Sequence, residues 1–141
     1  MDCTRFLKRV LAVNASFSAA SAGLALVAAE ALSGWLALPV PAVIATAVGL
    51  AAFAAAVLWH ASRRQLNLTS IRVIFALDVA WVIGTAAVLA WPGLPISVEG
   101  RWLLAAAGVV VGLFAAGEAF GLRGLGALRG SPAPSAAAPL R

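Results

Sequence analysis

The chain has 141 residues, of which 63% are hydrophobic and 11% are charged. Soluble domains average about 45–50% apolar and about 25% charged residues, and a soluble fold of this length has too little interior to hide so much apolar surface. Although the formal net charge is +5, the composition argues against a soluble enzyme, a nucleic-acid-binding domain and a disordered chain.

Four apolar stretches are each long enough to cross a bilayer, whose hydrocarbon core of about 30 Å needs about 20 helical residues. They lie at about residues 10–32, 41–59, 70–91 and 102–122. Proline, glycine and polar residues separate them, as expected of connecting loops. The sequence therefore predicts an all-α, polytopic membrane protein with four transmembrane helices in residues 10–122, after an N-terminal segment at 1–9 and before a tail at 123–141.

Basic residues set the expected orientation, because cytoplasmic loops and ends carry an excess of lysine and arginine. Except for Arg101, the ten basic residues fall in the N-terminal segment, around the second loop and in the C-terminal tail. We therefore expect both termini in the cytoplasm. The alanine- and arginine-rich composition is typical of bacteria with GC-rich DNA, which suggests the bacterial inner membrane. The tail is rich in Gly, Ala, Pro and Ser and is expected to be disordered.

The first span has a second interpretation, as a secretory signal that is cleaved. Basic residues precede an apolar segment, and Ala29, Glu30 and Ala31 fit a cleavage site. The length of the stretch and its polar residues, which include Asn14 and Ser18, argue against this interpretation. Cleavage would also remove one half of an internal repeat.

The two halves of the chain resemble each other. Three residues of the first span are matched in the third at one constant offset: Asn14, Phe17 and Ser21 correspond to Asp78, Trp81 and Thr85. The triplet Val-Gly-Leu at residues 48–50 recurs at 111–113 at nearly the same offset. This pattern predicts two parallel helical-hairpin repeats, related by an axis along the membrane normal. Chance similarity between Ala-, Val- and Leu-rich segments is the alternative.

Polar groups inside the predicted spans form the candidate site, because intramembrane ionisable residues are costly and need an explanation. Asn14, Asp78 and Glu118 each lie five or six residues from a basic residue at the same expected end of the bundle. At 1.5 Å per residue this is a depth of about 7–9 Å. Since alternate spans run in opposite directions, the three side chains come to one level, and His60 lies near its mouth.

Two interpretations of this level stay open. In the functional one, a polar cavity open to the cytoplasm holds a proton or a cation between two carboxylates. In the structural one, Asn14 hydrogen bonds to Asp78 and each acid pairs with a loop arginine: Arg63, Arg64, Arg72 or Arg123. Trp81 lies too deep for an interfacial aromatic belt. We expect it inside the bundle beside Asp78, with an acceptor for its indole N–H; a surface for a substrate is its alternative role.

Glycine pairs in the fourth span predict close helix packing. Gly108 with Gly112, and Gly117 with Gly121, are spaced as small-xxx-small motifs. We expect them to pack within the monomer, with a dimer interface as the alternative. No metal or cofactor is expected, because His60 and Cys3 are the only residues of their types and neither has a ligand partner at suitable spacing.

Asn14, Phe17 and Ser18 form an Asn-x-x-Phe-Ser pattern in the first span, and Asp78, Trp81 and Val82 form an Asp-x-x-Trp-Val pattern in the third. With these signatures the chain resembles a group of small bacterial inner-membrane proteins of unassigned function that have four spans. The resemblance covers about residues 5–123. It implies the four-span fold and carries no activity with it.

The sequence contains no nucleophile constellation, metal-ligand set or phosphate-binding loop, so we expect no enzyme activity. The predicted function is an accessory or structural module that packs in a homo-oligomer, such as a homodimer, or in a larger membrane complex. The alternative is a small proton- or cation-coupled transporter that uses Asp78 and Glu118. The lipid bilayer is the expected partner, and nucleic acid is not expected to be one.

Overall fold

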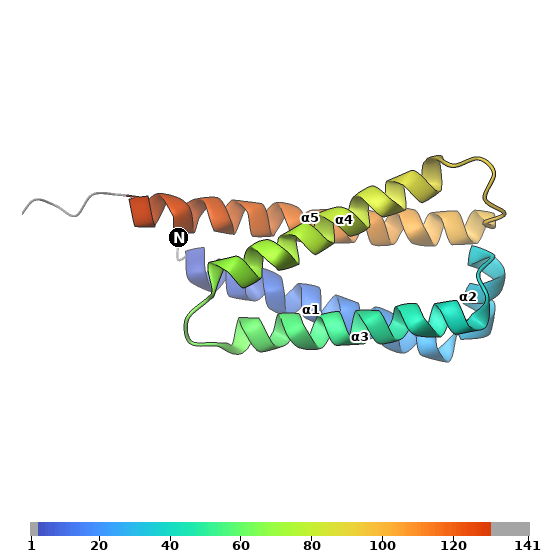
Figure 1. The fold of residues 1–141 in the computed structure, drawn as a ribbon, viewed down its shortest axis with the longest axis horizontal. Helices are drawn as coiled ribbons and strands as arrows, with labels where there is room; N and C mark the ends of the chain where they lie inside the picture. Colours follow the sequence, from blue (N-terminus) through green and yellow to red (C-terminus); the bar gives the residue numbers. More distant parts are fainter. Residues whose placement is uncertain (1–2, 131–141) are drawn as a thin grey trace, which may run out of the picture.

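The computed structural model describes residues 3–130, with side chains described for residues 3–126. This part of the chain is all-α and has five helices: α1 (Cys3–Val27), α2 (Ala29–Leu36), α3 (Val40–Ser62), α4 (Leu68–Ala90) and α5 (Val98–Gly130). The four long helices run side by side, and the short α2 lies across one end of them (Figure 1).

Within the described residues, four helices are long and apolar enough to cross a membrane: α1, α3, α4 and, over Val98–Gly126, α5. Large hydrophobic side chains cover much of the outer surface, among them Val27, Ile83 and Trp102. Helices that are apolar on their outer faces as well as their inner ones are suited to lipid rather than water. The predicted all-α, four-span membrane fold is confirmed.

The first predicted span is divided in the structure at Ala28. The backbone of Ala28 has φ −104° and ψ 25°, outside the helical range. Helical hydrogen bonds continue across the bend, because the N–H of Ala28 donates to Leu24 and the N–H of Leu32 donates to Ala28, both at 2.9 Å. The chain therefore changes direction without a loop. Helix α2 then ends at Leu36, and the next residue, Ala37, has a left-handed backbone with φ 52°.

The last helix is longer than the predicted span. Helix α5 continues past Leu122 to Gly130, so the first part of the predicted tail is helical rather than irregular. The rest of that tail, residues 131–141, lies outside the described residues.

Capping residues explain where the middle helices begin. The side chain of Asn67 accepts hydrogen bonds from the backbone N–H groups of Thr69 at 2.9 Å and Ser70 at 3.4 Å. These bonds satisfy donors that the first turn of α4 leaves free. Helix α3 instead begins after Pro39, with Pro41 in its first turn, where the missing proline N–H costs no helical hydrogen bond.

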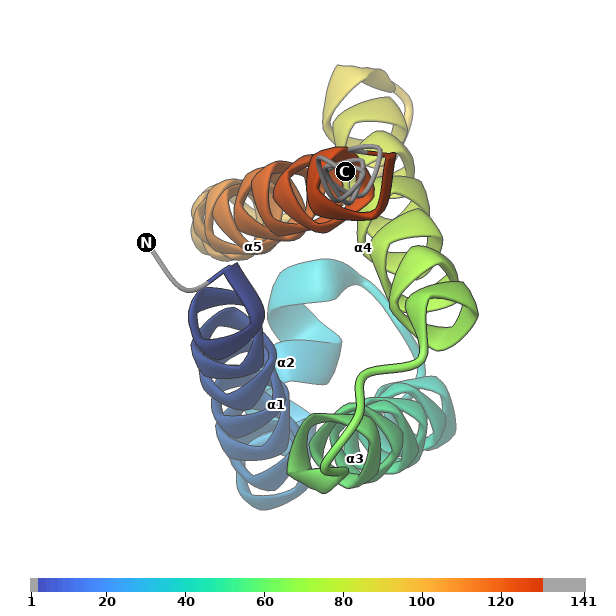
Figure 2. The ribbon, with the colours of Figure 1, turned by 90° about the vertical axis from the view of Figure 1, so that its left-hand side faces the viewer.

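The long helices pack as two hairpins, α1 against α3 and α4 against α5, and α1 joins the hairpins through α5. Helices α3 and α4 make little contact with each other. They meet at the end where their loop lies, in a core that contains Leu7, Leu11, Val57 and Ile71. From there the separation between α4 and α3 grows along the bundle, toward the end where α2 lies, as Figures 1 and 2 show. The duplication of sequence behind the two hairpins stays a prediction.

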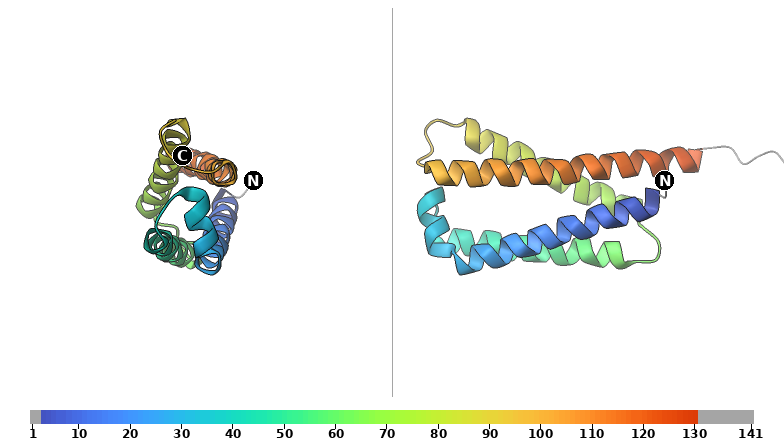
Figure 3. Two further views of the ribbon diagram at one scale, coloured as in Figure 1. Left: turned by 90° about the vertical axis from the view of Figure 1, so that its right-hand side faces the viewer. Right: turned by 180° about the vertical axis from the view of Figure 1, so that it is seen from behind.

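The start of α1, the end of α5 and the loop between α3 and α4 lie at one end of the bundle (Figure 3). Lys8 Nζ donates there to the carbonyl oxygens of Arg63 at 2.6 Å and Arg64 at 3.4 Å. The guanidinium of Arg63 lies 4.2 Å from the ring centre of Trp59. Basic side chains thus gather at this end of the molecule.

The glycine pairs of α5 face two different neighbours within the chain. A Cβ atom on each would approach a side chain of an adjacent helix: Gly108 and Gly112 meet Thr85 and Val82 of α4, and Gly117 and Gly121 meet Val10 and Leu7 of α1. The distance from the added Cβ to the nearest side-chain atom is 3.1 Å at Gly108, 3.9 Å at Gly112, 3.2 Å at Gly117 and 2.9 Å at Gly121. Missing side chains therefore let α5 lie close to both helices.

A third close approach involves Gly100, which is buried where α5 meets the end of α2. A Cβ atom on Gly100 would collide with the carbonyl oxygen of Trp35. The same oxygen accepts a hydrogen bond from the N–H of Ser97 at 2.9 Å. The carbonyl oxygen of Trp35 is a backbone atom and cannot rotate away as a side chain can. A larger residue at position 100 therefore has to displace the end of α2.

We expect Gly100→Ala to lower the free energy of unfolding by about 1–3 kcal/mol, the usual cost of forcing extra volume into a packed site. Gly84→Ala in α4 is the matched control, because nothing lies within 4 Å of its Cβ position. Chemical denaturation of the protein solubilised in mild detergent, monitored by circular dichroism, gives the free energy of unfolding of both variants and of the wild type. Equal stability of the two variants would contradict this packing.

Candidate functional site

Three polar side chains from three helices meet inside the bundle: Asn14 of α1, Asp78 of α4 and Glu118 of α5. Asn14 Nδ2 donates to Asp78 Oδ2 at 2.6 Å and to Glu118 Oε1 at 3.2 Å. Their exposed fractions are 1%, 4% and 0%. The structure thus brings together the three residues that the sequence placed at one depth, and we call them the polar triad. Asn14 and Asp78 occupy matching positions in the proposed repeat.

A fourth residue orients the Asn14 amide. The hydroxyl of Ser18, which is also buried, donates to Asn14 Oδ1 at 3.4 Å. Residues four positions apart share one face of a helix. With its oxygen engaged by Ser18, the amide presents its N–H groups to the two acids.

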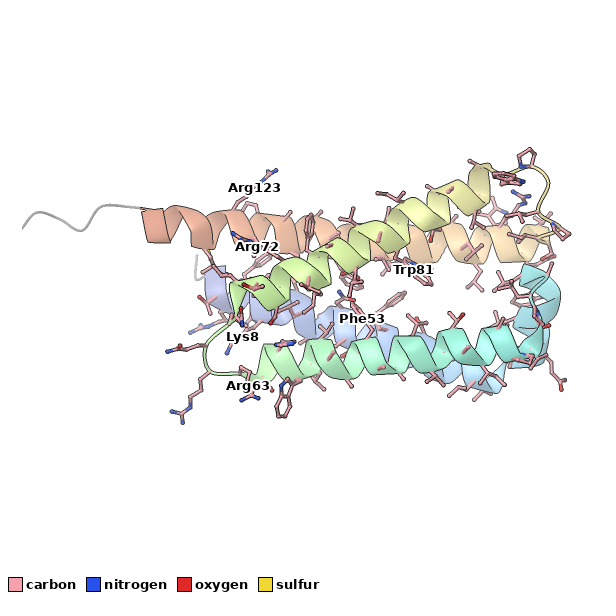
Figure 4. The ribbon with its side chains drawn as sticks, viewed as in Figure 1. Lys8, Phe53, Arg63, Arg72, Trp81 and Arg123 are labelled. Carbon is pink, nitrogen blue, oxygen red and sulfur yellow. The ribbon has the colours of Figure 1, made fainter. Side chains whose placement is uncertain are left out.

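The described residues provide no basic partner for the two acids. Arg63, Arg64, Arg72 and Arg123 are exposed, and Figure 4 shows three of them, Arg63, Arg72 and Arg123, near the end of the bundle that carries the chain's start. At the opposite end, Arg101 donates to the carbonyl oxygens of Leu89 and Leu94. The structural interpretation is therefore half correct, because Asn14 does bond to Asp78 but the loop arginines do not pair with the acids.

One oxygen atom of the triad receives no hydrogen bond within the part of the chain that the structure describes. Among the described residues, Glu118 Oε2 is buried and receives no hydrogen bond. Burying a carboxylate without a counter-charge or a full set of donors is expensive. The two acids share one neutral donor, and no basic side chain of the described residues offsets their charge.

An apolar cavity of about 700 Å³ borders the triad. All five helices contribute to its wall, and Asp78 is part of that wall. The cavity lies where α4 has diverged from α3, and Figure 4 shows Phe53 and Trp81 on these two helices. Leu32 and Leu36 of α2 line its far end. The cavity thus extends from Asp78 toward the short helix.

Trp81 differs from its prediction. It lies beside Asp78 as expected, but it lines the cavity and is 38% exposed instead of being packed in the interior. Within residues 3–126, its indole N–H has no hydrogen-bond acceptor. This exposure is consistent with the small contact between α3 and α4.

His60 is not joined to the polar triad. It lies in the last turn of α3 and is partly buried. No hydrogen bond among the described side chains links it to Asn14, Asp78 or Glu118. A mouth formed by His60 therefore stays a prediction.

Phe53 is a site residue that the sequence did not single out, whereas Ser18 was already part of the pattern that contains Asn14 and Phe17. Phe53 is one apolar residue within an alanine-rich helix, and nothing in such a helix distinguishes a cavity wall from a lipid-facing surface. Phe17 carried a signal, because it matches Trp81 in the proposed repeat, and both line the cavity.

The fold and the site define a multi-pass integral membrane protein with four spans and a buried polar triad beside an apolar cavity. Comparison with known protein families, with curated proteins and with solved structures finds no match for the chain. The family resemblance suggested by the two sequence signatures stays a prediction.

We expect Asn14→Ala to lower the free energy of unfolding by about 2–3 kcal/mol, because it leaves two buried acids without their shared donor. Ser16→Ala is the control on the same helix, since Ser16 is exposed and its hydroxyl bonds only to the carbonyl of Ala12. Chemical denaturation in detergent gives both values.

The same measurement in a Glu118→Gln background tests whether the loss runs through the acid. Removing Asn14 should cost less there, because a neutral amide is less costly to bury than a carboxylate. If Asn14→Ala is as harmless as Ser16→Ala, the triad does not exist as described.

Proposed function

We propose that the chain is a small, non-enzymatic proton-coupled membrane transporter, and that its polar triad binds and releases the coupled proton. One observation carries the proposal: Asp78 and Glu118 are both buried, share the Asn14 amide and leave Glu118 Oε2 without a hydrogen bond. Acids that face the interior of a helical bundle and lack a basic partner are typical of ion pathways and proton relays.

The two acids differ in their access to the cavity. Asp78 forms part of the cavity wall, whereas Glu118 is fully buried behind it. Asn14 joins them, so a change of charge at one carboxyl is felt at the other. We assign contact with the transported solute to Asp78. The exchangeable proton is held by Asp78 and Glu118 together, and Glu118 is the fully buried member of this pair.

An accessory role in a homo-oligomer or a larger complex is the second candidate. Ala19 and Gly23 of α1 favour it, because these small residues are exposed on the outside of the bundle and leave room for a helix of another subunit. The glycine pairs of α5 do not add to this argument, since they face α1 and α4 of the same chain.

For location, we propose a bacterial inner membrane with the basic end of the bundle in the cytoplasm. Lys8, Arg63, Arg72 and Arg123 lie near this end (Figure 4). The start of α1 and the end of α5, which both lie at this end, would then be cytoplasmic, in accordance with the excess of basic residues on that side of bacterial membranes.

Infrared difference spectroscopy of the protein in lipid bilayers tests the exchangeable proton. Between acidic and alkaline buffer, we expect the wild type to lose a protonated-carboxyl band that Glu118→Gln lacks from the start. Glu99→Gln is the control, because Glu99 is exposed at the start of α5 and should leave this band unchanged.

A wild-type spectrum that matches the spectrum of Glu118→Gln at both pH values contradicts the proposed function. The acids would then contribute only to packing, and the accessory role would be the better account. Asp78→Asn adds a check, because loss of the neighbouring carboxyl should shift the Glu118 band if the two groups share a proton.

A further inference from the structure

We propose that the cavity beside Asp78 binds a lipophilic organic cation, meaning an apolar molecule that carries one dispersed or quaternary positive charge. This inference rests on the proposed proton-coupled function and adds the class of solute. It depends on three features of the cavity: its apolar wall, the acid within that wall and the aromatic rings beside the acid.

The wall selects an apolar body. Leucine side chains from all five helices form much of it, among them Leu24, Leu36, Leu50, Leu77 and Leu104. The volume of about 700 Å³ lies within the range of about 300–1,000 Å³ found for small-molecule sites. A molecule with several rings or branched chains therefore fits between Asp78 and α2.

The charge of the wall selects a cation. Among the described residues that line the cavity, Asp78 is the ionisable one, and the other hydrogen-bonding side chains are Ser18, Ser21, Thr46 and Trp81. An anion would meet a carboxylate with no lysine or arginine to offset it. An organic cation instead supplies the positive charge that the two acids lack, without requiring hydrogen-bond donors of its own.

Three aromatic side chains line the same cavity as the carboxylate of Asp78. Trp81 follows Asp78 by about one helical turn, is 38% exposed and also lines the cavity. Phe17 and Phe53 line the wall from α1 and α3, and Phe17 is held by an edge contact with Phe114 at a centroid distance of 5.7 Å. Ring faces attract cations, most strongly where water is excluded.

The bundle offers such a molecule a route from the lipid. Helices α3 and α4 have little contact, and α4 moves away from α3 over the length of the cavity (Figure 1). A lipophilic cation dissolved in the bilayer can therefore enter sideways between these helices. Leu32 and Leu36 of helix α2 cover one end of the cavity, and Asp78 is the member of the polar triad that lies in its wall.

Binding and proton release are coupled by charge balance. Without solute, the two carboxyls share one proton and carry one remaining negative charge, and Asn14 bridges them. When an organic cation binds beside Asp78, its positive charge replaces that of the proton. The proton is then transferred from the carboxyl pair to water. One cation enters and one proton leaves, so the net charge of the site is unchanged.

Equilibrium dialysis of the detergent-solubilised protein with tetraphenylphosphonium tests the charge preference. Tetraphenylborate is the matched probe, because it has the same shape and the opposite charge. We expect saturable binding of tetraphenylphosphonium and at least about tenfold weaker binding of tetraphenylborate.

Three variants locate the bound probe. Asp78→Asn should weaken tetraphenylphosphonium binding by about tenfold or more, and Trp81→Leu by about three- to tenfold. Trp91→Leu is the control for loss of an exposed tryptophan and should bind as the wild type does. Circular dichroism measures whether each variant is folded. If Asp78→Asn does not fold, Trp81→Leu still tests the location of the bound probe.

Proton release is followed in the same samples with a pH-sensitive dye in weak buffer. We expect the wild type to release about one proton for each tetraphenylphosphonium bound, as replacement of one charge by another requires. Glu118→Gln should bind the probe but release fewer protons.

The outcomes separate the two proposals. Equal binding of both probes, unaffected by Asp78→Asn or Trp81→Leu, overturns the cation site and leaves an apolar cavity that suits a lipid chain. The infrared band of Glu118 would still stand as support for the proton site. Asp78-dependent, cation-selective binding without proton release would instead support the cation site and contradict proton coupling.

Discussion

The side-chain amide of Asn14 is the contact that joins the two halves of this bundle. It reaches from α1 to an acid on α4 and an acid on α5, and this contact is possible only because α1 and α5 lie close together. Gly117 and Gly121, on either side of Glu118 in the sequence, provide that approach by presenting no side chain to α1. Packing of small residues and pairing of polar residues thus support each other at one level of the membrane.

This contact also explains why the cavity lies where it does. The polar triad and the core around Leu7, Leu11 and Ile71 hold the helices together toward one end. Beyond that level α4 stays packed against α5 and separates from α3. The cavity lies between α3 and α4 there, and α2 contributes only to one end of its wall. Asp78 belongs to both regions, so the buried charge of the triad is presented to the apolar cavity.

The sequence predicts the features that depend on length and rise along a helix. Four apolar stretches predict the spans, and counting residues from the basic ends predicts that Asn14, Asp78 and Glu118 share a depth. It does not predict how the helices are rotated and tilted, which depends on side-chain packing between them. This is why the exposure of Trp81 and the role of Phe53 were missed. The bend at Ala28 was missed because neither proline nor glycine occupies that position.

Magic-angle-spinning NMR in lipid bilayers tests the central contact most directly. The chain contains two asparagines, Asn14 and Asn67, so replacing Asn67 with serine assigns the side-chain nitrogen of Asn14. With ¹⁵N-asparagine and ¹³C-carboxyl labels on aspartate and glutamate, we expect this nitrogen to correlate with the carboxyl carbons of both Asp78 and Glu118. Asp78→Ser and Glu118→Gln, neither of which adds an asparagine, should each remove one of these correlations. A spectrum in which the Asn14 nitrogen correlates with neither carboxyl would contradict the polar triad and the proposals built on it.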